Sequence, residues 1–125
     1  MPDELIPEDL RDFILRYIDS IAQVEALLLL CRNPNEDWDA ARTARRLYTS
    51  EQEATDVLAR LCTHGLLACN EGIYRYGCQS ADQEHMIDRL AEVYARHLIP
   101  VTNMIHAKPR RIREFADAFK FRKDR

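Results

Sequence analysis

Glycine is scarce in this chain, and its few copies are confined to one stretch. The 125 residues contain three glycines, at positions 65, 72 and 77. Because glycine supplies the backbone freedom of phosphate-binding loops, three copies beside one short turn region cannot build such a loop. Outside residues 65–78 the sequence is typical of helices, so the backbone freedom that glycine supplies is confined to that stretch.

Sequence signatures of catalysis and of membrane insertion are also missing. No segment matches G-x-x-x-x-G-K-[ST], G-x-G-x-x-G or H-E-x-x-H, and the four histidines are scattered without a neighbouring nucleophile. No apolar run approaches the roughly 20 residues that cross a bilayer. The first residues are acidic, whereas a secretory signal begins with a basic segment. We therefore expect a cytoplasmic protein that is not an enzyme and holds no cofactor.

The four cysteines lack the paired C-x-x-C spacing of a metal knuckle or redox motif. They lie at positions 31, 62, 69 and 78. Cys62, His64, Cys69 and Cys78 place four potential zinc ligands within 17 residues, but structural zinc sites usually draw ligand pairs from a tight knuckle. We expect four free thiols in a reducing compartment, and no metal site.

Charge is unevenly distributed along the chain. The net charge is −3, yet residues 108–125 carry eight basic and three acidic groups, or +5. The first 107 residues carry ten basic and eighteen acidic groups, or −8. This asymmetry indicates an anionic partner or self-association of unlike surfaces, unless the basic segment is simply a solvated helix end.

Capping boxes mark where helices begin. A serine followed three residues later by Glu or Gln precedes a helical pattern three times, at Ser20–Gln23, Ser50–Glu53 and Ser80–Gln83. We expect the first helix over about residues 7–18. The second helix, over about 20–32, is apolar almost all round, which predicts a buried central position.

Two shorter helices and a hairpin are predicted next. Asp39 caps a helix whose inward face is Ala40, Ala41, Ala44 and Leu47, and Tyr48-Thr49 forms the turn. The following helix begins after Ser50 and points Ala54, Val57, Leu58 and Leu61 inward. Two apolar segments around the loop Asn70-Glu71-Gly72 then predict a β-hairpin, with residues 73–76 as its second strand.

In this order and spacing, residues 20–77 resemble bacterial winged helix-turn-helix transcription regulators. The resemblance rests on an apolar helix, a Trp38 link, a small-residue helix ending in Leu, a tight turn, a helix ending in Leu-x-x-x-Gly-Leu-Leu, and a Tyr-x-Tyr hairpin. It implies a mainly α fold with one small hairpin. We expect a winged-helix region over 1–79 and a helical extension over 80–125 that packs as part of one domain.

The second helix of a helix-turn-helix enters the major groove, which makes its outward residues the candidates for DNA contact. Gln52 and Arg60 are candidate base readers, and Thr55 and Thr63 are candidate phosphate contacts. Further phosphate contacts are expected from Arg42, Arg45, Arg46 and Arg75. However, residues 50–65 carry a net charge of −2, and winged helices also serve as protein-interaction modules. Two hypotheses stay open: a DNA-binding transcription regulator, or an interaction adaptor that does not bind DNA.

The C-terminal third carries a second apolar pattern. Spacings of three and four predict a coiled-coil-like seam and a candidate homodimer interface at Ile87, Leu90, Tyr94, Leu98, Val101 and Ile105. The alternative is that these residues pack against the first helix within one chain. Pro100 predicts a kink or break near residues 98–99. After Pro109 we expect a last helix over 111–120 that docks on the acidic body within the dimer. The alternatives are contact of its arginines with the DNA backbone, or binding to a membrane surface.

Overall fold

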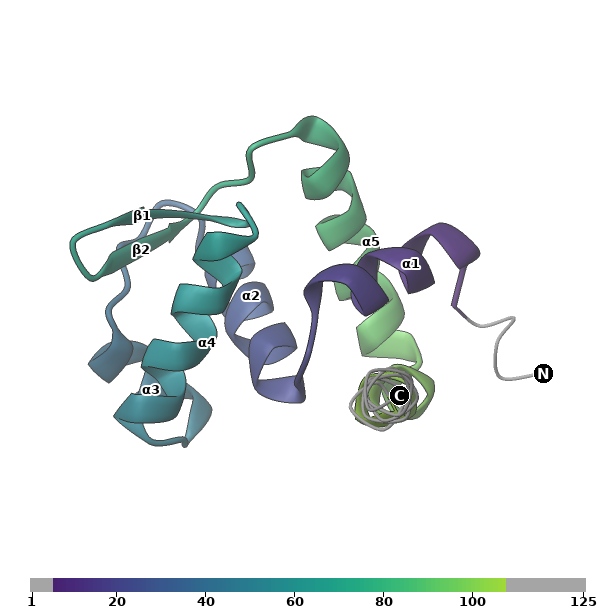
Figure 1. Ribbon diagram of the computed structural model, residues 1–125, viewed down its shortest axis with the longest axis horizontal. Helices are drawn as coiled ribbons and strands as arrows, with labels where there is room; N and C mark the ends of the chain where they lie inside the picture. The colour runs from purple at the N-terminus through teal and green to yellow at the C-terminus, as the bar shows by residue number, and fades with distance from the viewer. Residues whose placement is uncertain (1–5, 108–125) are drawn as a thin grey trace, which may run out of the picture.

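The fold places two groups of secondary-structure elements on either side of a central helix (Figure 1). The computed structural model describes residues 6–107. The elements are α1 (Glu8–Tyr17), α2 (Ile21–Arg32), α3 (Ala40–Leu47), α4 (Glu51–Thr63), β1 (Leu67–Asn70), β2 (Ile73–Tyr76) and α5 (Ala81–Arg96). Residues 98–107 are also helical. The expected mainly α architecture with one small hairpin is confirmed.

All three predicted capping boxes form their first hydrogen bond. The serine oxygens accept from the backbone N–H groups of Gln23, Glu53 and Gln83 at 3.2, 3.0 and 3.1 Å. The return contact of the third residue differs from the expectation. The Gln23 side chain accepts from the N–H of Asp19, and the Gln83 amide donates to the carbonyl of His64 at 3.4 Å. The boxes therefore fix the helix starts and also tie them to neighbouring segments.

Left-handed backbone positions shape the path from α4 into the hairpin. Gly65 ends α4 with φ of 75°, and its N–H donates to the carbonyl of Cys62 at 2.9 Å. The hairpin loop consists of Glu71 and Gly72, with φ of 49° and 80°. This loop is one residue shorter than expected because Asn70 already pairs with Ile73 in the ladder.

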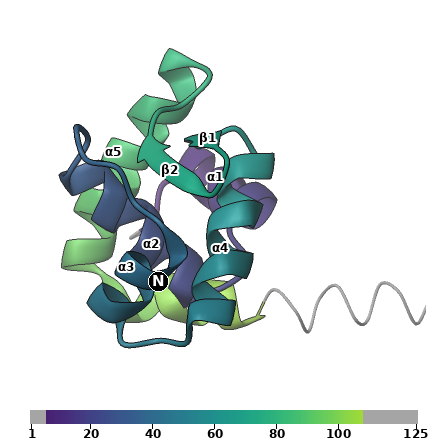
Figure 2. The ribbon, with the colours of Figure 1, turned by 90° about the vertical axis from the view of Figure 1, so that its left-hand side faces the viewer.

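Trp38 adds a short third segment to the hairpin. The backbone N–H of Trp38 donates to the carbonyl of Tyr74 at 2.8 Å, and the backbone N–H of Tyr74 donates to the carbonyl of Trp38 at 2.7 Å. The indole is almost fully buried, at 1% exposure. The sheet was expected around residues 66–76 alone, so this bridge is a finding of the structure. It connects the hairpin to the segment that leads into α3, while the hairpin and α3 lie at opposite ends of α4 (Figures 1 and 2).

One hydrophobic cluster joins both groups of elements. It contains Leu27, Leu28 and Leu30 of the central helix α2, which is buried as predicted. It also contains the predicted inward residues Val57, Leu58 and Leu61 of α4. On α3 the fully buried position is Thr43, whose hydroxyl donates to the carbonyl of Asp39 at 2.8 Å. The sequence pattern did not indicate this inward threonine.

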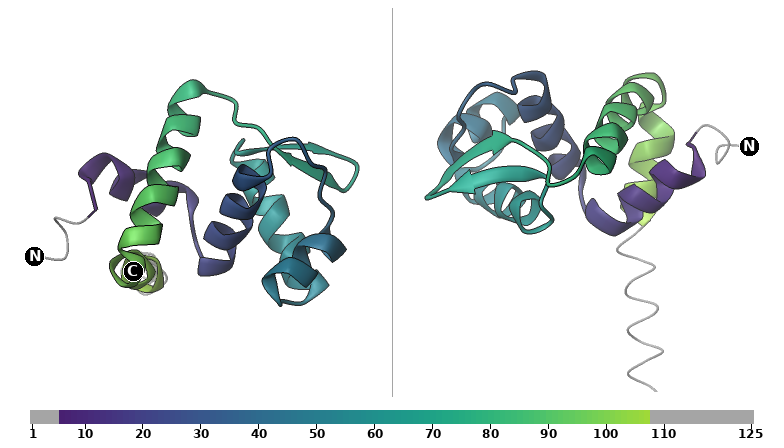
Figure 3. Two further views of the ribbon diagram at one scale, coloured as in Figure 1. Left: turned by 180° about the vertical axis from the view of Figure 1, so that it is seen from behind. Right: turned by 90° about the horizontal axis from the view of Figure 1, so that it is seen from above.

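The C-terminal seam packs inside the chain. Ile87, Leu90, Tyr94, Val101 and Ile105 are all buried in the same cluster as the stripe of α1. Of the six seam residues, Leu98 alone is exposed, at 51%. The placement differs from the predicted dimer interface because α1 lies against α5 and residues 98–107 and covers the seam (Figure 3).

The helical path breaks where proline predicted it. α5 ends at Arg96, His97 caps it, and a new helical segment starts at residue 98. Pro100 is thus the third residue of the new segment, where the missing N–H breaks no helical hydrogen bond. The predicted helix over 111–120, with its basic residues, lies outside the described residues.

Two of the four cysteines are paired, which corrects the expectation of four free thiols. Cys62 at the end of α4 and Cys69 in β1 form a disulfide with Cα atoms 6.3 Å apart. The turn at Gly65 folds β1 back against the last turn of α4, which brings the two sulfurs together. Cys31 and Cys78 are free. Within residues 6–107, no group of three or more potential ligands is arranged to hold a metal ion.

None of the helices in the described part of the chain has both the length and the apolar character that a membrane span requires.

Candidate nucleic-acid interface

The outward face of α4 carries the four predicted contact residues. With Ala54 and its three apolar partners buried, Gln52, Thr55, Arg60 and Thr63 are all exposed. The helix begins with its positive dipole end at Ser50, next to Gln52. α4 therefore presents polar side chains along one solvent-facing side.

Neighbouring groups already occupy part of this polar side. The Gln52 amide donates to Asp56 at 3.1 Å, and the hydroxyl of Thr55 donates to the carbonyl of Glu51 at 2.9 Å. Arg60 lies 3.6 Å from a carboxylate oxygen of Asp19. These contacts are on exposed side chains, so a partner can replace them at small cost.

Arg42 is used to support the fold. Its guanidinium lies 3.8 Å from the centre of the Trp38 ring and pairs with Glu36. It also donates to the carbonyl of Asp37 at 2.7 Å. The attraction between a guanidinium and the face of an indole ring stabilises the contact between Arg42 and Trp38. Removing Arg42 would therefore disturb the Trp38 segment as well as any phosphate contact.

Arg45 is an exposed cation of the predicted set. It is exposed in the last turn of α3 and makes no ion pair or hydrogen bond through its side chain within residues 6–107. Arg46 is also exposed, with its guanidinium 5.7 Å from the Trp38 ring centre. A phosphate contact through Arg45 requires no existing interaction to break.

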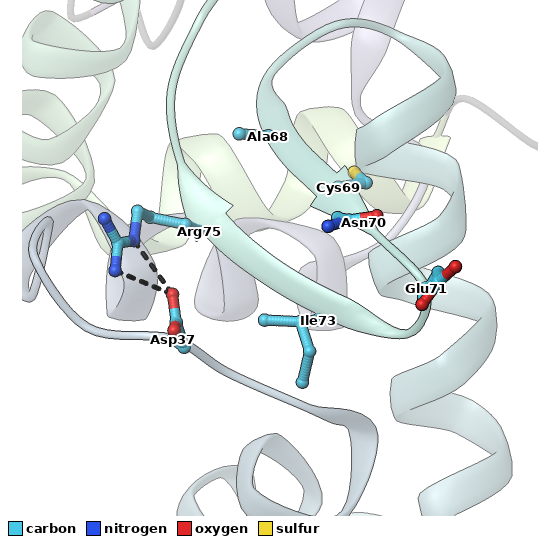
Figure 4. Close-up of a pocket in the computed structure, with 7 residues that line it drawn as sticks. All are labelled: Asp37, Ala68, Cys69, Asn70, Glu71, Ile73 and Arg75. Carbon is cyan, nitrogen blue, oxygen red and sulfur yellow. Dashed lines mark hydrogen bonds and ion pairs between the residues drawn. The ribbon is translucent and has the colours of Figure 1, made fainter.

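Arg75 in the hairpin forms an ion pair with Asp37. Its Nε and a terminal nitrogen lie 2.9 and 2.8 Å from one oxygen of Asp37 (Figure 4). The pair borders a shallow hollow of about 440 Å³ between the hairpin and the Trp38 segment. Glu71 stands at the tip of the hairpin, so the tip itself is acidic (Figure 4).

Tyr48 is a feature that the sequence did not reveal. It stands in the turn between α3 and α4 with φ of 57°, and 95% of its surface is exposed. A left-handed conformation is costly for a bulky residue, and an exposed aromatic ring gains little from the fold. The left-handed residue is the C-cap of α3, where the Tyr48 backbone N–H donates to the carbonyl of Ala44. This conformation leaves the ring exposed just before the start of α4.

The two free thiols lie on the other side of the hairpin, around Tyr76. The Cys78 thiol donates to the Tyr76 hydroxyl at 3.8 Å. Burial raises the pKa of the Cys31 and Cys78 thiols, and it raises the pKa of Tyr76 well above its usual value. These groups remain protonated near neutral pH, which makes both sulfurs weak nucleophiles.

Of the predicted contact residues within 6–107, Arg45, Arg46 and those on the outward face of α4 are thus exposed to a partner, and Tyr48 is exposed beside them in the sequence. Comparisons with models of known protein families, with curated protein sequences and with solved structures found no match to this chain.

Proposed function

We propose that residues 20–77 form a winged helix-turn-helix and that the protein is a DNA-binding transcription regulator. The observation that carries the proposal is the pairing of Trp38 with Tyr74. With it, the chain order is a helix, a short strand, two helices joined by a three-residue turn, and a hairpin that pairs with the short strand. This is the arrangement in which the second helix of the pair reads the major groove.

The contact surface in this proposal is the turn and the first half of α4. Arg45 and Tyr48 lie at the turn, and Gln52 and Thr55 follow on the outward face of α4. The helix N-terminus there favours phosphate through its dipole and free N–H groups. Arg60 and Thr63 lie in the second half of α4 and would add DNA contacts next to this surface.

Specific observations favour a second candidate, a protein-interaction adaptor. Arg42, Arg60 and Arg75 each face a carboxylate. The exposed side of α4 also carries Glu51, Glu53 and Asp56, and phosphate neutralisation normally supplies much of DNA affinity. An acidic, polar α4 would suit a basic protein surface.

Binding to a mixed-sequence duplex separates the two candidates. We expect fluorescence anisotropy to detect binding at low salt, with an affinity that falls steeply as salt rises. Arg45→Ala should reduce the salt slope by about one. Arg96→Ala is the matched control, because Arg96 is also an exposed arginine but lies on α5, outside the proposed contact surface. Absence of binding at low ionic strength would favour the adaptor instead.

Removal of negative charge gives an independent check. Asp56→Asn keeps the size of the side chain and its contact with Gln52, while it removes one acid from the face of α4. If α4 faces DNA, this variant should bind the duplex several-fold more tightly at low salt. Asp88→Asn, on the exposed side of α5, should leave the affinity unchanged.

The regulator is proposed to act as a homodimer. Since most of the seam is buried within one chain, the dimer contact would use the exposed aliphatic pair Leu98 and Ile99, at 51% and 69% exposure. Light scattering at micromolar concentration should give the mass of two chains. Leu98→Ser combined with Ile99→Ser should give the mass of one chain with an unchanged circular dichroism spectrum. A monomeric wild-type protein would contradict the dimer.

A further inference from the structure

A groove with an apolar floor and an acidic rim runs between α1 and the start of α5. Its volume is about 230 Å³. One face of α1 and the first turns of α5 line it, and Figure 3 shows these two helices side by side. The floor is formed by Phe13, Tyr17 and Met86. The Phe13 and Tyr17 rings pack together with their centres 5.1 Å apart.

Aspartates from both helices form the rim. Asp9 is paired with Arg89, which holds the pKa of its carboxyl below the usual range although partial burial opposes the effect. Asp12 and Asp82 form no ion pair within residues 6–107. Among residues 6–107, Arg16 is the one cation that lines the groove, and its guanidinium lies 5.4 Å from the centre of the Tyr17 ring. The groove therefore remains net acidic.

The chemistry of the groove fits a basic segment that carries aromatic side chains. Residues 108–125 contain eight Lys or Arg and the phenylalanines Phe115, Phe119 and Phe121. The net charge of this segment is +5, opposite in sign to the −8 of the first 107 residues. Phenylalanine would cover the floor, and the basic groups would meet Asp12 and Asp82.

The segment is also long enough to reach the groove. It begins directly after residues 98–107, whose Val101 and Ile105 share the core with α1 and α5. Eighteen residues span up to about 60 Å when extended, whereas α5 with its 16 residues is about 24 Å long. Attachment to the same chain raises its local concentration to the millimolar range.

We propose that residues 108–125 dock in the groove between α1 and α5 of their own chain. The docked segment covers the half-buried Tyr17 and Met86 of the floor and neutralises the acidic rim. The groove is formed by other elements than the candidate DNA interface, so docking of the segment does not depend on DNA binding.

Limited trypsin digestion of the full chain tests the docking. Trypsin cuts after the basic residues of the segment, and the cutting rate follows the fraction of molecules in which the segment is undocked. Asp12→Asn combined with Asp82→Asn should raise the cutting rate between residues 110 and 123 by about fivefold. Added salt should raise the wild-type rate in the same direction.

Two acids outside the groove provide the matched control. Glu8 and Glu84 lie in the first turns of the same two helices, are exposed, and do not line the groove. Glu8→Gln combined with Glu84→Gln should leave the cutting rate at the wild-type value. Equal rates in both double variants, with unchanged circular dichroism, would overturn the proposal. So would a wild-type rate that falls over a roughly hundredfold rise in protein concentration, because the occupant would then be the segment of a second copy.

Discussion

The hairpin region, residues 36–76, and the terminal region, α1 with α5 and residues 98–107, are held together by contacts of different range. In the hairpin region, the disulfide joins residues seven positions apart, Gly65 and Tyr48 set tight turns, and the Asp37–Arg75 pair spans 38 positions. In the terminal region, Arg89 pairs with Asp9 across 80 positions, and the Tyr94 hydroxyl of α5 connects this region to Glu25 of the central helix α2 across 69. Local contacts form early at low entropic cost, whereas distant contacts require the chain ends to meet.

Because of this difference, the two regions are sensitive to different kinds of substitution. The hairpin region depends on backbone geometry and on one buried indole. The terminal region depends on complementary packing of apolar stripes from opposite ends of the chain. The single core cluster that includes both regions predicts that they unfold together.

The largest effect is expected from Trp38→Ala. The indole is 1% exposed, packs in the core cluster and lies under the guanidinium of Arg42, whereas the bridge to Tyr74 is made by the backbone and stays in the variant. Its removal should lower the free energy of unfolding by about 4 kcal/mol, measured by urea denaturation with circular dichroism. Ile73→Ala, at a partly exposed hairpin position, should cost below about 1 kcal/mol. A comparably small loss in Trp38→Ala would show that backbone contacts alone hold the hairpin.

Leu90→Ala tests the terminal region and its coupling to the hairpin. Leu90 is fully buried, so we expect a loss of about 3 kcal/mol. Trp38 is the single tryptophan of the chain, and its fluorescence reports on the hairpin region while circular dichroism reports on all helices. The two unfolding transitions should coincide. Separate midpoints would show two independent units and would break the shared-core interpretation.

Reduction of the disulfide should have an intermediate effect. Its short loop predicts a stabilisation of about 2 kcal/mol through the unfolded state, so Cys62→Ser with Cys69→Ser should lower the free energy of unfolding by that amount. Alkylation in denaturant without reductant should label Cys31 and Cys78 alone in the protein isolated without reductant. Four labelled cysteines by mass spectrometry would contradict the pairing.

The smallest effect is expected at the turn. Tyr48→Gly removes the strain of the left-handed backbone and should stabilise the fold by about 0.5 kcal/mol, measured as a small rise in the melting temperature. Tyr48→Ala removes the ring but keeps the strain, so it should give no gain. Equal stability of both variants would show that the ring, and not the backbone angle, determines the effect.

Much of the secondary structure could be predicted because its causes are local. The serine caps and the apolar spacing fixed the starts and buried faces of α2, α4 and α5, and Pro100 marked the break after α5. The hairpin followed from its glycine turn. The candidate contact residues of α4 are exposed as expected, since burial of Ala54 and Leu58 places them outward.

Other features could not be predicted because they depend on which distant segments meet. The same spacing of Ile87, Leu90 and Tyr94 serves a dimer seam or an internal core equally well. The Asp37–Arg75 pair closes across 38 positions, and nothing near Arg75 in sequence indicates this partner. The pairing of Cys62 with Cys69 depends on the direction in which the chain leaves Gly65.

The sequence by itself determined the helices, their caps, the hairpin, the position of the break and the contrast between an acidic body and a basic end. Tertiary structure decided which apolar stripes cover each other, which arginines are already paired, and that Arg45 and Tyr48 remain open. The physical reason is the sequence separation over which each interaction acts. Caps, turns and helical periodicity act over a few residues, whereas burial, ion pairing and exposure depend on the surface that another part of the chain brings into contact.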